Sequence, residues 1–181
     1  MHDLSLFVLD LIENSLRARA SVIRLTLEQD PEKDVLTIAV EDNGHGLAVA
    51  PEEAKDPFYT TKKGKRTGLG LSFLEEAVQQ AGGALSIGKS ELGGTSVRAT
   101  MQMNHIDRYP LGDLATSIAS VVCTNPRVEL VCRVRVGGRG VVLCVSESIK
   151  ELPAGHRDGI AAARHVREEL RAAMDALEVK Q

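Results

Sequence analysis

The sequence predicts a chain of mixed α and β structure, α/β in the broad sense and α+β in organisation. We expect a two-layer sandwich in which a mixed, mostly antiparallel sheet is covered by helices on one face. Several short segments alternate apolar and polar residues, as half-buried strands do, and others repeat apolar residues every three or four positions, as amphipathic helices do. Hydrophobic residues make up 43% of the 181 residues, aromatic residues only 3%, and Trp is absent. We therefore expect a core of aliphatic side chains.

The first hundred residues are expected to contain two helices and four strands. Asp3 or Ser5 can cap the first helix, and Gly82 with Gly83 ends the second. The Asp, Pro and Lys residues at 30–34 are typical of a hairpin loop between the first two strands. The helices are expected at 3–19 and 70–81, and the strands at 21–28, 35–40, 84–89 and 95–103.

No periodicity is sustained from Leu47 to Arg66. A stretch of this length without secondary structure is unusual inside a compact domain, and such stretches often carry function. We therefore expect a long, partly mobile functional loop there.

A change of composition at 104–110 predicts a boundary between a first domain at 1–103 and a small C-terminal α-β-β-α unit at 104–181. The helices of this unit are amphipathic, and its strands flank a glycine turn at 137–140. We expect its elements at 111–123, 127–136, 141–146 and 158–177.

The three cysteines are interpreted as structural, because their spacing is not that of a metal site. Cys132 and Cys144 lie in alternating apolar runs, where a thiol behaves as a small hydrophobic side chain. If Val136 pairs with Val141, the two thiols point to opposite sides of the sheet, which argues against a disulfide.

Charge and hydropathy exclude several classes of protein. The net charge of −3 gives no electrostatic basis for a nucleic-acid or membrane partner. The N-terminus lacks the positive segment of a signal peptide, and no run approaches the ~20 apolar residues of a membrane span. We expect a cytoplasmic protein with reduced thiols.

Four polar residues share one stripe of the first predicted helix, since Asp10, Glu13, Asn14 and Arg17 stand at positions i, i+3, i+4 and i+7. The side-chain oxygen of Asn14 suits a hard ion such as Mg²⁺ that also contacts phosphates. A solvated helix face would explain the same stripe.

Asp42 stands at the end of an apolar strand, where its carboxylate can accept a hydrogen bond from the amino group of adenine. A buried carboxylate rejects bases without that donor, because it would be left unpaired. Gly44 and Gly46 allow the backbone to approach a ring closely. In isolation, however, Asp-Asn-Gly is also typical of a simple turn.

The segment 60–70 is rich in Thr, Lys and Gly and leads into the second helix. Exposed amides and a helix N-terminus favour phosphate binding, and basic side chains add positive charge. The spacing is neither that of a P-loop nor that of a dinucleotide-binding fingerprint. The candidate nucleotide-binding residues here are Thr60, Thr61, Lys62, Lys65, Arg66, Gly68, Leu69 and Gly70.

Four segments in this order resemble the GHKL superfamily of ATP-binding domains, which includes gyrase, chaperone ATPases, sensor histidine kinases and mismatch-repair clamps. They are LDLIENSLRARA at 9–20, EDNGHG at 41–46, DPFYTTKKGKRTGLGLS at 56–72 and GGTS at 93–96, and the resemblance covers about residues 3–103. The third and fourth segments look most like a sensor histidine kinase. The first looks more like the mismatch-repair ATPases, whose corresponding helix carries ENSLDAGA.

The resemblance implies ATP and Mg²⁺ as cofactors. It makes Asn14 the magnesium ligand and Asp42 the carboxylate that reads adenine, and it places Arg17 where a Lys often reaches a phosphate. Thr95 would belong to the contacts on the adenine side. The glycines that shape the pocket and its lid would be Gly44, Gly46, Gly68 and Gly70.

The chain departs from the family at the position of the general base. The family's ATPases carry a Glu four residues before the Asn, where this chain has Asp10, and a carboxylate one methylene shorter falls short by on the order of an ångström. We therefore expect slow hydrolysis. Asp10 could instead hold a metal-bound water or only complete the polar stripe. Glu13 lies nearby but points elsewhere on the helix.

No phosphate acceptor is recognisable in the sequence. Sensor histidine kinases place the accepting His on a helical hairpin before the ATP domain, and none of the five His residues here has that acidic helical context. We expect a stand-alone kinase that phosphorylates a partner protein, as the anti-sigma-type serine kinases of the superfamily do. An ATP-gated binding module is the second hypothesis, with the C-terminal unit as the surface for a partner or a homodimer. A DNA-repair clamp ATPase ranks third.

Overall fold

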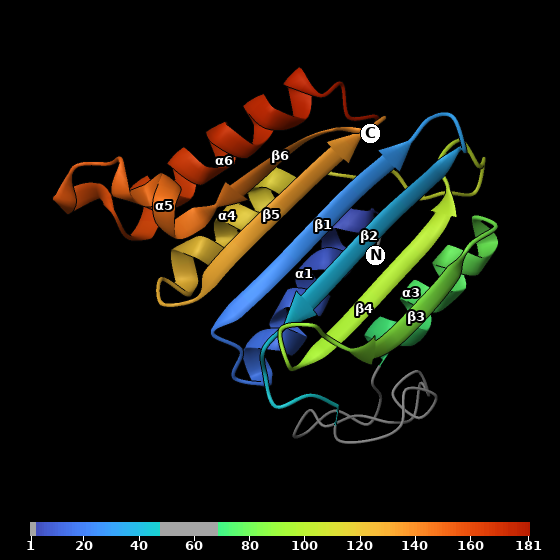
Figure 1. Ribbon diagram of the computed structural model, residues 1–181, viewed down its shortest axis with the longest axis horizontal. Helices are drawn as coiled ribbons and strands as arrows, with labels where there is room; N and C mark the ends of the chain where they lie inside the picture. Colours follow the sequence, from blue (N-terminus) through green and yellow to red (C-terminus); the bar gives the residue numbers. More distant parts are fainter. Residues whose placement is uncertain (1–2, 48–68) are drawn as a thin grey trace.

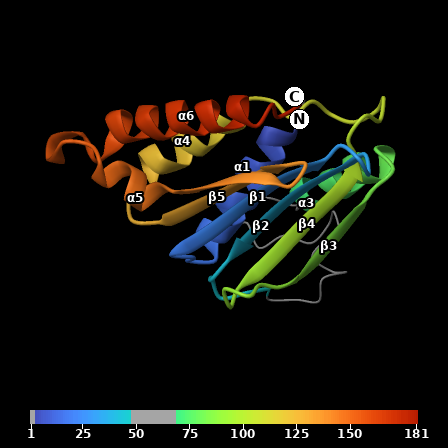
Figure 2. The ribbon, with the colours of Figure 1, turned by 45° about the horizontal axis from the view of Figure 1, so that its top comes forward.

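The protein forms two layers, a six-stranded sheet and a set of helices packed on one of its faces (Figure 1). The computed structural model describes residues 3–47 and 69–181. Figure 2, tilted from the first view, shows the helices on the same side of the sheet. The predicted two-layer α+β sandwich is therefore confirmed.

The strand order is β3-β4-β2-β1-β5-β6. Neighbouring strands run antiparallel except β1 and β5, which are parallel, so the sheet is mixed and mostly antiparallel as predicted. The strands are β1 (Val22–Asp30), β2 (Val35–Asp42), β3 (Ala84–Lys89), β4 (Thr95–Gln102), β5 (Glu129–Val136) and β6 (Arg139–Cys144).

The helices agree with the predicted ranges except after β6. They are α1 (Leu4–Arg17), α3 (Leu69–Gln80), α4 (Leu114–Thr124), α5 (Val145–Lys150) and α6 (Gly159–Ala176), with a 3₁₀ turn η1 (Ala154–His156). The prediction of strand at 145–146 was wrong, because Val145 begins α5 and buries its side chain there together with Ser148. Along the described ranges, no helix is both long and apolar enough to cross a membrane.

The core lies between the sheet and the helices and is mostly aliphatic, as predicted. In β1, alternate residues Ile23, Leu25 and Leu27 are at most 2% exposed, whereas the residues between them are only half-buried. This alternation places every second side chain under the helices and the others on an open face. One face of the sheet is therefore polar and uncovered in the described part of the chain.

The C-terminal residues extend the same sheet instead of forming a second one. β5 pairs in parallel with β1, and α4 packs against α1. The connection at 104–110 is held by Arg108, whose guanidinium donates to the carbonyl oxygens of Met103 at 2.6 Å, Tyr109 at 2.8 Å and Gln181 at 2.9 Å. The predicted boundary thus coincides with a loop that is tied to the end of the chain.

The predicted register of the last hairpin was wrong by two residues. Val136 lies opposite Arg139 and not Val141, because a tight turn at Gly137 and Gly138, with φ of 54° and 85°, joins the strands. A shift of two residues keeps each side chain on its face. Cys132 therefore still points into the core while Cys144 points to the open face, and burial raises the pKa of the Cys132 thiol to about 12.

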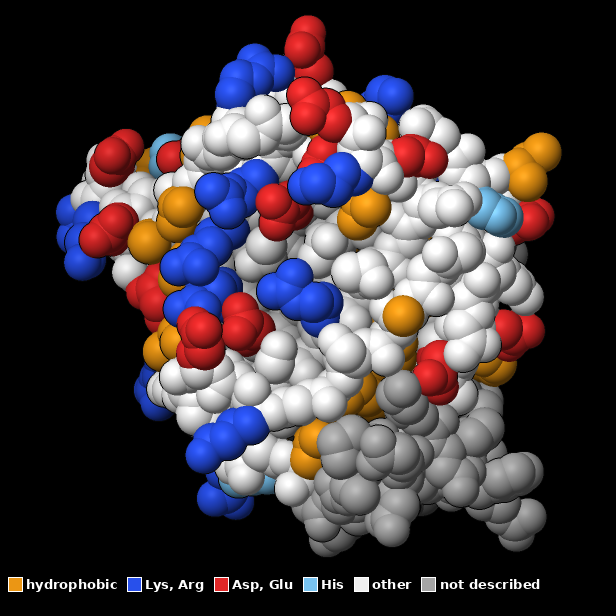
Figure 3. All heavy atoms as spheres, turned by 45° about the vertical axis from the view of Figure 1, so that its right-hand side comes forward, with side chains coloured by type: hydrophobic (Ala, Val, Ile, Leu, Met, Phe, Trp, Pro, Cys, Tyr) orange, Lys and Arg blue, Asp and Glu red, His pale blue; other side chains and the backbone are white. Residues whose placement is uncertain are grey.

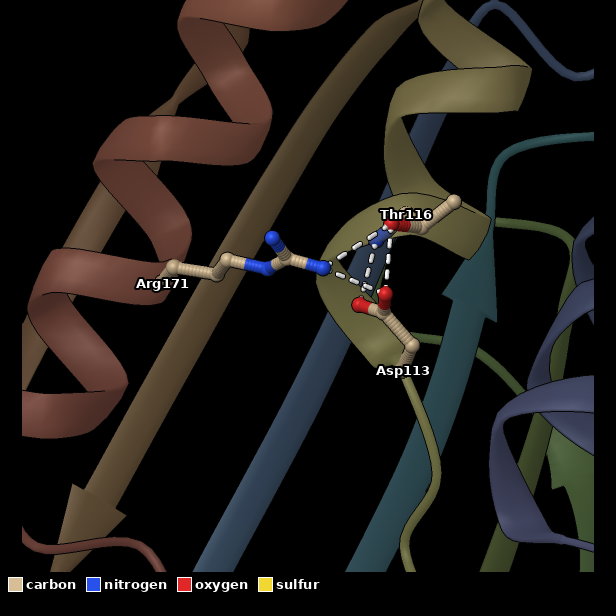
Figure 4. Close-up of polar contacts among 3 residues, drawn as sticks. All are labelled: Asp113, Thr116 and Arg171. Carbon is tan, nitrogen blue, oxygen red and sulfur yellow. Dashed lines mark hydrogen bonds and ion pairs between the residues drawn. The ribbon is translucent and has the colours of Figure 1, made fainter.

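A polar contact joins helices α4 and α6 (Figure 4). Asp113 caps α4 by accepting from the Thr116 amide at 3.0 Å and from the Thr116 hydroxyl at 2.7 Å. Arg171 of α6 donates to the same carboxylate and to the Thr116 hydroxyl. The hydroxyl of Thr116 foremost, then the Thr116 amide and the Arg171 guanidinium, lower the pKa of Asp113.

We predict that Asp113→Ala lowers the free energy of unfolding by about 1 kcal/mol, because α4 loses its capping side chain. Since folding lowers the pKa of Asp113, this contribution is present at neutral pH and is lost as the pH falls through the folded-state pKa. Urea unfolding at neutral and acidic pH measures the difference between variant and wild type. This difference in the free energy of unfolding should be smaller at acidic pH than at neutral pH.

Asp158→Ala is the matched control, because Asp158 stands at the N-cap of α6 without a side-chain capping bond. Its free energy of unfolding should stay close to that of the wild type. An equal decrease in the free energy of unfolding for the two variants would contradict the role given to Asp113.

Candidate functional site

Three of the predicted segments meet at one end of the sheet. The C-terminal turns of α1, the end of β2 and the start of β4 lie together there, and α3 begins at the same end (Figure 1). Hydrogen bonds from α1 and from the start of β4 converge on one side chain, Asp42. The site is therefore built around that residue.

The Asp42 carboxylate is buried and accepts three hydrogen bonds. It lies opposite Ile23, on the helix side of the sheet, and is 3% exposed. Its Oδ1 accepts from the amides of Gly44 at 2.8 Å and Thr95 at 3.1 Å, and its Oδ2 accepts from the Ser15 hydroxyl at 2.7 Å. These bonds hold the carboxylate in one orientation and offset the cost of burying it.

Two glycines are required because the backbone passes so close to this carboxylate. A Cβ atom at Gly94 would lie 2.2 Å from Asp42 Oδ1, and one at Gly44 would lie 2.7 Å from the Ala18 carbonyl oxygen. Gly46 has room for a side chain but a φ of +80°, so its requirement is conformational. Gly44 and Gly46, both predicted, thus serve different physical needs.

The turn after Asp42 is fixed to the end of α1. Asn43 Oδ1 accepts from the amides of Ser21 and Val22, each at 2.9 Å, and its Nδ2 donates to the Ser21 hydroxyl. The His45 amide donates to the Ala18 carbonyl at 3.0 Å. The Asp-Asn-Gly segment is therefore held by residues 18–22, and the Gly44 amide within it helps to orient Asp42.

The four residues of the predicted polar stripe lie together on α1. Asn14 Nδ2 lies 3.5 Å from Asp10 Oδ2, and Arg17 donates to Asn14 Oδ1. Glu13 is exposed and pairs with Arg17 at 3.6 Å. Ser15 follows Asn14 directly in α1 and bonds to Asp42 at the end of β2. The polar stripe therefore lies next to the end of β2.

Asp10 lies against the first turn of α3. A Cβ atom at Gly70 would lie only 2.0 Å from Asp10 Oδ2, so Gly70 permits this approach. A carboxylate at a helix N-terminus is stabilised by the helix dipole and the free amides. Asp10 thus has a structural contact with α3 besides its place in the stripe.

Two side chains here carry oxygen atoms of the kind that binds Mg²⁺. The described residues contain no cluster of three His, Cys, Asp or Glu side chains. The Asn14 amide oxygen and the Asp10 carboxylate lie on one face of α1. Mg²⁺ commonly takes one or two protein oxygens and completes its shell with phosphates and water. Asn14 and Asp10 fit that pattern.

Part of the predicted site lies outside the described residues. This holds for the side chain of Leu69, whose backbone begins α3, and for Thr60, Thr61, Lys62, Lys65, Arg66 and Gly68. It also holds for most of the loop predicted at 47–66.

Sequence reasoning missed Ser15, Asn43 and Gly94 as parts of the site. Ser15 is 4% exposed, and a hydroxyl on the apolar side of an amphipathic helix is a signal that it needs a buried partner. Asn43 and Gly94 were not singled out within their segments. Their roles depend on contacts between segments far apart in the chain.

Comparison with known protein families finds a match over more than half of the chain. The model of the family described as "Histidine kinase-, DNA gyrase B-, and HSP90-like ATPase" matches residues 2–105. The match covers all three segments that build the site around Asp42.

Several curated relatives are sensor kinases. The chain is 42% identical over 66 residues to the sensor kinase CckA of Brucella abortus (strain 2308), covering 35% of the chain and 7% of that protein. It is 37% identical over 93 residues to the sensor histidine kinase CpxA of Escherichia coli (strain K12), covering 47% and 20%. Against the sensor protein kinase PilS of Pseudomonas aeruginosa, identity is 32% over 105 residues, covering 55% and 20%. The chain therefore spans a fifth or less of these relatives.

A solved structure with a TM-score above 0.5 shares the fold, and two others are reported with lower scores. The N-terminal domain of a DNA repair protein has a TM-score of 0.54 and 16% identity, covering 80% of this chain and 53% of that one. The ATP-binding domain of PrrB from Mycobacterium tuberculosis has a TM-score of 0.39 at 24% identity, covering 54% and 64%. The Aquifex aeolicus MutL ATPase domain complexed with ADP has a TM-score of 0.45 at 21% identity, covering 80% and 63%.

The family match covers more than half of the chain, and it confirms the resemblance to the GHKL superfamily that the four segments indicated. The chain belongs to the histidine kinase-, DNA gyrase B- and HSP90-like ATPase family.

Proposed function

We propose that this chain binds Mg-ATP between Asp42 and Asn14 and transfers phosphate to a partner protein. The observation that carries the proposal is the Ser15–Asp42 hydrogen bond, which fixes the carboxylate at the end of β2 beside the polar stripe of α1. Membership of an ATPase family supports ATP binding.

The Asp42 carboxylate supplies the adenine end of the site. A carboxylate oxygen has about two lone pairs, and Asp42 Oδ2 accepts one bond from Ser15. The remaining lone pair can accept from the amino group of adenine. The Thr95 and Gly44 amides hold Oδ1, so they preserve the orientation of the group while the base binds.

Asn14 supplies the metal end. Its Oδ1 is the atom to which Arg17 donates, so Mg²⁺ on that oxygen would repel the guanidinium and favour its release. The Arg17 side chain is 43% exposed and free to turn toward a phosphate. Bound Mg²⁺ would neutralise the phosphates, and Asp10 would hold a water of its shell.

Slow hydrolysis is part of this proposal. Asp10 is shorter than the Glu of related ATPases, and it lies against both Asn14 and the start of α3. A base held this way is poorly placed to deprotonate an attacking water. Phosphate would then pass to a protein acceptor, and the sensor-kinase names of the relatives favour that class of reaction.

A second function, an ATP-gated switch, is favoured by the same release of Arg17. Removing its hydrogen bond from Asn14 rearranges the stripe, and Asp10 would pass the change to α3 through the contact at Gly70. In either case we propose a cytoplasmic protein. The division at 103/104 and a homodimer through the C-terminal unit stay predictions, and a DNA-repair clamp ATPase ranks last.

We predict that Asn14→Ala weakens binding of Mg-ATP about tenfold or more, because the metal loses an oxygen ligand. Binding of ATP in the presence of EDTA should change much less. Calorimetric titration measures both affinities. Asn104→Ala is the control and should bind as the wild type does, because Asn104 bonds to Asp34 at the opposite end of β2 from Asp42. Full Mg-ATP affinity in Asn14→Ala would remove Asn14 from the metal site.

We also predict that radiolabelled ATP, incubated with this protein and a lysate of its source cells, labels one discrete protein. The label should disappear with Asn14→Ala, because phosphate transfer needs the metal. Absence of any labelled protein while ATP is still bound would contradict the kinase. Protection from proteolysis by a non-hydrolysable ATP analogue would then favour the switch.

A further inference from the structure

The open face of the sheet carries three arginines that form no ion pair with another described residue. Arg98 lies on β4 and Arg133 and Arg135 on β5, all on the side away from the helices. None of the three forms an ion pair with any residue in the described ranges. Lys and Arg side chains form a column on this face (Figure 3).

Arg24 on the same face shows the contrast. It lies 3.4 Å from Glu41 and 3.8 Å from Glu91, so its charge is neutralised within the chain. Arg139, at the start of β6, pairs with Glu178 at 3.4 Å. Arg98, Arg133 and Arg135 differ from Arg24 and Arg139 in forming no ion pair within the described residues.

The three unpaired side chains have a defined spacing. Arg133 and Arg135 are two residues apart on one strand, which separates their Cα atoms by about 7 Å. Arg133 and Arg98 lie in one row across β5, β1, β2 and β4, which is about 14 Å for three strand spacings. Two residues of an extended chain span the shorter distance, and about four span the longer.

The positions between the arginines carry short side chains. Thr26 and Ala39 occupy the two positions between Arg133 and Arg98, and Thr37 lies one pair along β2. Ala39 is 0% exposed and Thr37 is 7% exposed, so neighbouring side chains of the open face cover these positions in the described part of the chain. A partner would therefore contact the guanidinium groups themselves and not the strands beneath them.

We propose that this open face binds an acidic polypeptide segment. Guanidinium groups bind carboxylates through paired hydrogen bonds, and arginine clusters are a recurrent means of recognising acidic motifs. The charges of such a segment complement the unpaired arginines of the open face. This surface lies apart from Asp42 and Asn14, so the proposal does not depend on nucleotide binding.

A polypeptide fits this face better than a nucleic acid does. Glu28 lies opposite Arg135 in the register and Glu41 opposite Arg24, so acidic groups interrupt the row that a continuous phosphate backbone would follow. The six strands contain no aromatic residue on which a base could stack. A segment with separate carboxylates can instead avoid both glutamates.

The test uses the full chain, labelled with ¹⁵N, and a synthetic peptide in which Glu alternates with Thr. We expect chemical-shift changes confined to β1, β2, β4 and β5. A control peptide in which Gln replaces each Glu should cause no chemical-shift changes. Added salt should weaken binding of the Glu peptide. The double variant Arg133→Gln, Arg135→Gln should bind roughly tenfold more weakly, since two charged contacts are lost.

Arg164→Gln on α6, an exposed arginine on the helical layer, is the matched control and should bind the peptide as the wild type does. Thermal unfolding checks that each variant is folded. The proposal is overturned by absence of peptide binding, by equal weakening in Arg164→Gln, or by shifts centred on Asp42. Tighter binding of oligo-thymidylate than of the peptide would overturn it in favour of nucleic acid.

Discussion

The hydrogen bonds to the Asp42 carboxylate are the interaction on which the site depends. Three donors from α1, the turn after β2 and the start of β4 meet on one buried side chain. Without them the carboxylate would be costly to bury. The glycines at 44 and 94 exist to let the backbone come this close. The same bonds that join the three elements therefore also aim an acceptor at the end of the proposed pocket.

Helix α1 connects this acceptor to the proposed metal site. The apolar side of α1 packs against the sheet. Ser15 lies on that buried side and bonds to Asp42, and the polar stripe lies next to it on the helix. Asp10 lies against α3 through Gly70 and Ser15 bonds to Asp42 at the end of β2, so α1 contacts two other elements of the site directly. A change at Asn14 can be passed in two directions, toward Asp42 and toward α3. This arrangement suits either phosphate transfer or a nucleotide-dependent switch.

Local patterns predicted most elements but not the contacts between distant ones. Apolar periodicity was enough for α1, β1 and β2, and the Asp-Pro cluster for their hairpin. The β5–β6 register failed because it depends on a two-residue glycine turn, and α5 was missed because six residues show too little periodicity. Asp42 and Asn14 were predicted from their segments. Ser15 and Asn43 were not, since their partners lie more than twenty residues away.

The most direct measurement compares ATP with purine riboside triphosphate, which lacks only the amino group of adenine, on the unmodified protein. If the Asp42 carboxylate reads that amino group, calorimetry should show ATP bound at least about tenfold more tightly, because the analogue leaves a buried acceptor unpaired. Equal affinity for the two nucleotides would show that Asp42 does not contact the base. It would leave the hydrogen bonds around Asp42 with a structural role alone.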